Sequence, residues 1–112
     1  MQMFIGIKFL KKGRYNVQIK ELTKIIIDWI KYEHFLSQLE AVGFSLVPKH
    51  PLWVTSNHYG DFISTKYNIS CEELYEMLGP AFNNPTMNEE DIENYAEKCA
   101  QTLLLTENKS SL

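Results

Sequence analysis

The chain has 112 residues, of which 45% are hydrophobic and 22% are charged. This length is the usual size of one domain, and the proportions exclude a disordered chain. No uninterrupted apolar run is longer than three residues, as at Ile25–Ile27, which excludes a membrane-spanning helix. Residues 1–10 make a poor signal peptide, so we expect a cytoplasmic protein. We expect a single globular domain over residues 1–106 and a flexible tail at 107–112.

Charge is distributed unevenly along the sequence. Residues 1–50 contain eight Lys/Arg and four acids, a net charge of +4, whereas residues 51–112 contain three Lys and ten acids, a net charge of −7. Such asymmetry concerns partners and solubility rather than fold. A binding surface is therefore expected in the acidic half.

The first twenty residues favour β-structure. Residues 4–10 are mostly apolar, residues 11–14 contain the flexible Gly13, and residues 15–20 alternate apolar with polar side chains. Alternation with period two is typical of a half-buried strand, so we predict an antiparallel hairpin. The alternative is a helix that begins near Asn16 after a lone strand or arm.

The periodicity then changes to that of a helix. From Glu21 to Val42, apolar residues recur every three or four positions: Leu22, Ile25, Ile26, Trp29, Tyr32, Leu36 and Leu39. This pattern predicts a helix with one apolar face, in which Trp29 and Leu36 are buried. Gly43, which readily adopts a positive φ, is expected to end the helix.

The middle of the chain combines strand and turn signals. Residues 44–47 and 52–55 are short apolar runs, which predict two strands separated by the proline-rich segment 48–51. Residues 56–61 have the composition of a turn. Residues 62–67 fit either a strand or a short helix.

Two further helices follow. Ser70 and Glu73 form a capping box, and the helix that begins there is expected to end at Gly79–Pro80. Thr86 or Asn88 is expected to cap the last helix. Its predicted inward face comprises Ile92, Tyr95, Ala96, Cys99 and Leu103. Together these elements predict an α+β fold, with about three helices packed on a small antiparallel sheet or hairpin.

Residues 62–78 resemble a helix-turn-helix. Apolar residues occupy the positions where the motif needs them: Ile63, Tyr67, Ile69, Leu74 and Leu78. Asn68 lies where the motif usually has glycine. The resemblance implies a small DNA-associated regulator. Charge opposes this function, because the would-be recognition helix carries Glu72, Glu73 and Glu76 and no cation, whereas DNA affinity depends on neutralising phosphates.

Residues suited to catalysis or metal binding are few. Cys71, at the start of a predicted helix, and His58 are the one conceivable nucleophile pair, but Glu72 and Glu73 oppose thiolate formation. The His and Cys residues lack the spacing of a zinc site, and the scattered glycines form no phosphate loop. We therefore expect no enzyme, no metal and no cofactor.

The acidic run is the feature that points to a function. Residues 70–107 contain nine acids and the single cation Lys98, a net charge of −8. Solvated helices usually mix both signs, because oppositely charged pairs stabilise them. A surface of one sign suits a basic partner protein. The candidate partner-binding residues are Glu72, Glu73, Glu76, Glu89, Glu90, Asp91 and Glu93.

We therefore expect a small non-enzymatic binding protein of the immunity, antitoxin or anti-defence inhibitor type. Its acidic surface would cover a basic site on a toxin, a nuclease or a nucleic-acid-binding complex. Direct binding to nucleic acid or to membranes is not expected, and a homodimer is left open.

Overall fold

The structure of the protein is a computed structural model that describes residues 2–44 and 51–110. These residues form four helices: α1 (Gln2–Ala41), α2 (Pro51–Tyr67), α3 (Cys71–Phe82) and α4 (Glu89–Ser110). No strand occurs in this described part, so the expected α+β fold with a sheet or hairpin is wrong and the fold is all-helical. None of the described helices is long and apolar enough to cross a lipid bilayer.

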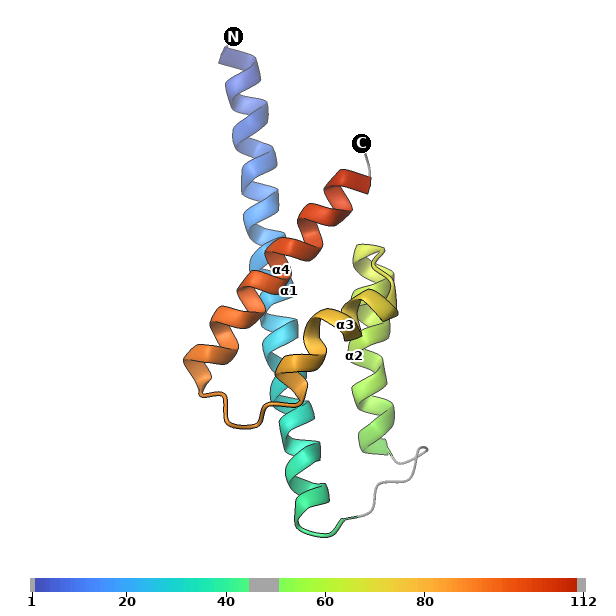
Figure 1. Ribbon diagram of the computed structural model, residues 1–112. Coiled ribbons are helices and arrows are strands. Elements are labelled where there is room, and N and C mark those ends of the chain that lie inside the picture. Colours follow the sequence, from blue (N-terminus) through green and yellow to red (C-terminus); the bar gives the residue numbers. More distant parts are fainter. Residues whose placement is uncertain (1, 45–50, 111–112) are drawn as a thin grey trace.

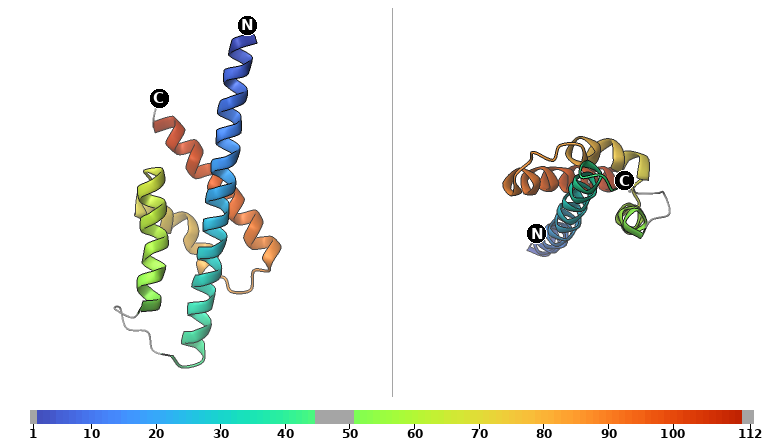
Figure 2. Two further views of the ribbon diagram at one scale, coloured as in Figure 1. Left: turned by 180° about the vertical axis from the view of Figure 1, so that it is seen from behind. Right: turned by 90° about the horizontal axis from the view of Figure 1, so that it is seen from below.

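The molecule is built around the long helix α1 (Figure 1). Its 40 residues account for the 63 Å long axis, because an α-helix rises about 1.5 Å per residue. Helix α2 runs antiparallel to the second half of α1, and α4 crosses α1 obliquely, as the views in Figure 2 also show. Helix α3 leads from the end of α2 to the loop before α4.

The predicted N-terminal hairpin is wrong, because the first part of the chain belongs to α1. The alternation that suggested a strand does not mark one buried face. Val17 is 64% exposed, whereas Ile19 is partly buried against the core. Gly13 lies inside the helix, where glycine costs only about 1 kcal/mol relative to alanine. The alternative of a helix starting near Asn16 places the beginning too late.

The second half of α1 agrees with its predicted pattern. Trp29 and Leu36 are 0% and 1% exposed, so both are buried as expected. The helix ends at its predicted glycine, since Gly43 has a φ of +99°. The amide of Phe44 donates to the carbonyl of Leu39 at 3.0 Å, the hydrogen bond that a left-handed residue makes possible at a helix end.

Helix α2 replaces the strand predicted at 52–55 and the turn predicted at 56–61, and residues 62–67 are also helical. Pro51 occupies the first helical position, where its missing N–H costs no intrahelical hydrogen bond and its fixed φ suits the helix. The other predicted strand, at 44–47, lies almost entirely outside the described residues.

Small polar residues of α2 that suggested a turn have a packing role. Ser56 is buried and donates a hydrogen bond to the carboxylate of Glu33, which also accepts one from the indole N–H of Trp29 at 3.1 Å. A Cβ at Gly60 would stand 3.3 Å from the Trp29 ring, closer than ordinary van der Waals contact. These residues therefore let α1 and α2 approach closely.

Helices α3 and α4 complete one core cluster. Helix α3 does not end at Gly79–Pro80 as predicted but continues to Phe82. Its last turn packs inward, because Ala81 is buried and the rings of Phe82 and Trp29 have centroids 4.8 Å apart. Helix α4 has its predicted inward face, with Tyr95 partly buried and four residues fully buried: Ile92, Ala96, Cys99 and Leu103.

The end of the chain is helical to Ser110. The flexible tail expected at 107–112 stays a prediction.

Candidate functional site

Helices α2 and α3 are joined by the short turn 68–70. Asn68 has a φ of 55°, a left-handed conformation that glycine and asparagine adopt most readily, and the amide of Ile69 donates to the carbonyl of Ser64 at 3.1 Å. The apolar positions of the resemblance are all buried: Ile63, Tyr67, Ile69, Leu74 and Leu78. The two helices and the turn that the helix-turn-helix resemblance implies are therefore present.

Helix α3 begins at its predicted cap. The Ser70 hydroxyl accepts a hydrogen bond from the amide of Glu73 at 3.1 Å. The buried face comprises Leu74, Leu78 and Ala81. Glu72, Tyr75 and Glu76 are all exposed. They share one side of α3, because residues three and four positions apart are neighbours on a helix surface. We call these three residues, with Glu73 at their edge, the acidic face of α3.

Tyr75 lies at the edge of this face, next to Trp29 of α1. It is 43% exposed, and its ring packs edge-on against the ring of Trp29 with centroids 5.6 Å apart. Partial burial raises the pKa of Tyr75, and the neighbouring charges of Glu33, Cys71 and Asp61 raise it further. Glu72 and Glu76 add formal negative charge to the same exposed helix side, so this face combines an aromatic ring with acidic side chains.

The acids of α4 have different surroundings. Asn88 caps the helix by accepting a hydrogen bond from the amide of Asp91 at 2.8 Å. Glu89 forms an ion pair with Lys31 of α1 at 2.8 Å. The hydrogen bond from Lys31 lowers the pKa of Glu89, and the same bond, with the charge of Glu93, raises the pKa of Lys31. The first turn of α4 therefore lies beside a cation.

The contact between α1 and α4 brings opposite charges together over a longer stretch. Glu97 of α4 and two cations of α1, Lys20 and Lys24, line one hollow of about 360 Å³ between the helices. Helix α1, from the basic half of the sequence, thus packs against α4, from the acidic half. Some of the charge asymmetry is therefore balanced within the molecule, which no local spacing in the sequence reveals.

The structure does not bring the seven predicted partner-binding residues together. One group, on α3 next to the end of α2, consists of Glu72, Glu73 and Glu76. The other, at the start of α4 on the opposite side of α1, consists of Glu89, Glu90, Asp91 and Glu93 (Figures 1 and 2). Between described side chains, the ion pairs involve Glu89 and Glu21 and none of the α3 acids. The candidate surface therefore narrows to the acidic face of α3.

Cys71 and His58 lie on different helices. Cys71 is exposed at the start of α3, whereas His58 is exposed on α2, about 14 Å along the helix axis from the last residue of α2, Tyr67. Cys99 is buried, and burial raises the pKa of its thiol to about 11. Among the residues that the structure describes, no group of three or more His, Cys, Asp or Glu could hold a metal ion.

Comparisons with protein-family models, with curated proteins and with solved structures found no match for this chain. Its function is therefore inferred from the chemistry of its own surface.

Proposed function

We propose that the protein is a non-enzymatic binding protein of the immunity, antitoxin or anti-defence inhibitor type, and that the acidic face of α3 covers a basic site on a partner protein. One observation carries this proposal. Glu72 and Glu76 are exposed on the same side of α3 as the half-exposed Tyr75, and neither belongs to an ion pair between described side chains. The acids at the start of α4, by contrast, lie beside Lys31.

This combination of groups suits a protein interface. Charges of one sign raise the rate of association with an oppositely charged surface and disfavour other partners. Tyrosine is enriched in interface cores, because its ring contributes apolar contact area and its hydroxyl a hydrogen bond. A cytoplasmic toxin, nuclease or nucleic-acid-binding complex fits as the partner, since its working surface is basic.

A DNA-associated regulator is the second candidate, and the helix–turn–helix arrangement of α2 and α3 favours it. Its recognition helix would be α3, which exposes Glu72 and Glu76 and contains no Lys or Arg. Phosphates would repel these carboxylates, whereas known DNA readers use cations to neutralise phosphates. The arrangement is therefore better suited to a basic protein than to DNA.

Affinity capture from nuclease-treated extract of the native host tests the proposal. The tagged chain is compared with Glu72→Lys/Glu73→Lys/Glu76→Lys and with Glu90→Lys/Asp91→Lys/Glu93→Lys, which keeps the Glu89–Lys31 pair. Circular dichroism first confirms that all forms are folded. We expect a basic protein to be captured by the wild type and the α4 variant and lost with the α3 variant.

Equal capture by all three forms would contradict the proposal. Tight, sequence-selective binding to duplex DNA in a mobility-shift assay at physiological salt would favour the regulator instead.

A further inference from the structure

A second surface lies away from the acidic face, along the first part of α1. This part of the helix extends beyond the other helices in both views (Figures 1 and 2). Residues 2–20 contain five cations and no acid: Lys8, Lys11, Lys12, Arg14 and Lys20. Residues 3–10 are apolar apart from Gly6 and Lys8. A helix so rich in apolar residues gains stability from burial.

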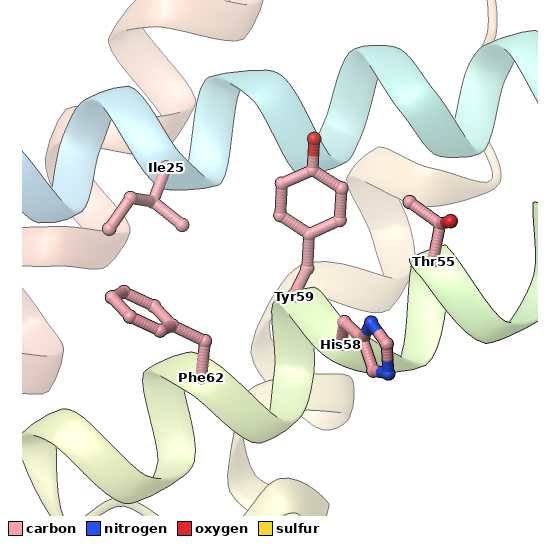
Figure 3. A pocket seen from close by; sticks show the side chains of 5 residues that line it. All are labelled: Ile25, Thr55, His58, Tyr59 and Phe62. Atoms are coloured by element: carbon pink, nitrogen blue, oxygen red, sulfur yellow. The ribbon is translucent and has the colours of Figure 1, made fainter.

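An apolar groove between α1 and α2 matches this segment. Its lining consists of Ile25, Thr55, His58, Tyr59 and Phe62, and its volume is about 250 Å³. Figure 3 shows Ile25 of α1 opposite Phe62 and Tyr59 of α2. Phe62 is 51% exposed although it is a large apolar side chain. The groove is thus an apolar surface that the molecule leaves partly uncovered.

Two acids of α1 lie near the groove. Glu21 lies near one end and pairs with Lys66 of α2. Asp28 is exposed, and its charge contributes to the raised pKa of Tyr59, which places it close to the groove. No ion pair between described side chains involves Asp28. An incoming cationic helix would therefore find a complementary charge.

We propose that this groove binds the N-terminal part of α1 from a second copy of the chain, and that the contact is reciprocal about a twofold axis. The N-terminal segment and helix α2 have similar lengths. Residues 2–16 span about 22 Å as a helix, and the 17 residues of α2 span about 25 Å. The contact covers the groove of each copy, and a twofold contact closes without further growth.

The register of this contact follows from helical periodicity. Positions 10, 14, 17, 21 and 25 recur at steps of three or four residues, so they share one side of α1. We place the α1 helices of the two copies side by side and antiparallel, with the centre of their contact next to Val17. Position 10 of one copy then lies opposite Ile25 of the other, and position 14 lies opposite Glu21 of the other. Val17, which is 64% exposed, then lies close to the axis.

Sedimentation of the full chain tests the dimer. Phe62→Glu places a charge in the groove and should raise the dimer dissociation constant at least about thirtyfold. The control Val42→Glu, at another exposed apolar residue beyond the end of α1, should leave the dissociation constant unchanged. A wild-type chain that is monomeric at every concentration, or a dimer that Phe62→Glu does not weaken, overturns the proposal.

Oxidative cross-linking tests the register without a destabilising change. Cys71 is exposed, so Cys71→Ser is the background. When it is added to the Cys71→Ser variant, Val17→Cys should form a disulfide-linked dimer, whereas Val42→Cys should not. Cross-linking at neither position, or equally at both, contradicts the register.

A lipid surface is the competing occupant of the N-terminal segment. If the protein stays monomeric in solution but co-floats with phosphatidylserine vesicles, the N-terminal segment binds a membrane and the dimer proposal is wrong. Phe62→Glu leaves the acidic face of α3 unchanged, so it should still capture the partner of the proposed function. Failure of the dimer is therefore distinguishable from failure of that function.

Discussion

Helices α3 and α4 both begin with a capped, acidic first turn, yet their acids face different neighbours. The first turn of α4 packs toward α1, where Glu89 pairs with Lys31 at 2.8 Å. The first half of α3 lies at the end of α2 and presents Glu72, Tyr75 and Glu76 to solvent. The same sequence signal thus has two physical meanings.

The difference shows why net charge along a chain is a weak guide to a binding surface. Cations and acids far apart in sequence cancel when the fold places them together, as Lys31 and Glu89 do across 58 positions. Glu72 and Glu76, by contrast, take part in no ion pair between described side chains.

The largest effect is expected for the inward face of α4. Leu103 is 0% exposed, so Leu103→Ala should lower the free energy of unfolding by about 2–5 kcal/mol, through lost burial and the cavity left behind. Leu105→Ala is the control, because Leu105 is 52% exposed and its truncation should change stability by about 0.5 kcal/mol or less. Urea unfolding measures the free energy of unfolding of both variants. Similar losses of stability in the two variants would show that Leu103 is not on the buried face of α4.

The two cysteines provide a second contrast between the helices. Burial raises the pKa of Cys99 from 9.0 to about 11, so its folded-state value lies above its unfolded value. The stability that the neutral thiol contributes is therefore present below pH 9.0 and lost as the pH rises toward about 11.

Comparison of Cys99→Ala with the wild type isolates this effect from other groups that titrate in the same range. The thermal midpoint of the wild type should fall more steeply between these pH values than that of the variant. At neutral pH, alkylation should modify the exposed Cys71 much faster than Cys99. Equal alkylation rates would place Cys99 at the surface.

A smaller effect on stability should separate the two acidic turns. Reversal of Glu89, Glu90 and Asp91 to Lys breaks the Glu89–Lys31 pair and sets a new cation beside Lys31, whereas reversal of Glu72, Glu73 and Glu76 breaks no ion pair between described side chains. Both variants lose the favourable interaction of acids with the helix N-terminus. We expect the α4 variant to melt at a lower temperature, with a gap that narrows as salt is added. A lower midpoint for the α3 variant would contradict the charge assignment.

The sequence predicted those parts of the fold in which local signals agree with packing. The apolar face around Trp29 and Leu36, the glycine end of α1 and the Ser70 cap are all confirmed, because periodicity and capping act within a few residues. Long periodic segments with defined ends are where such signals are strongest.

The errors arise where tertiary contacts outweigh local preference. Ser56 and Gly60 have turn propensity, but in α2 one bonds Glu33 and the other leaves room for the Trp29 ring. Pro80 interrupts one backbone hydrogen bond, yet burial of the last turn keeps α3 helical to Phe82. Neither contact is visible in the neighbouring residues.

The candidate surface was predicted only in part. All seven acids were identified from the sequence, but their division into two separate groups depends on how α4 crosses α1. Tyr75 was missed, because an aromatic residue between acids on a helix has no signature of its own. Its role in the surface follows from its 43% exposure and its contact with Trp29.

The most direct test of the central claim is the association rate with the captured partner as a function of ionic strength. Reversal of Glu72, Glu73 and Glu76 to Lys should slow association at low salt by about tenfold or more and remove most of its salt dependence. Reversal of Glu90, Asp91 and Glu93 should change the rate by about twofold or less. Equal rates for the wild type and the α3 variant would contradict the claim that the acidic face of α3 binds the partner.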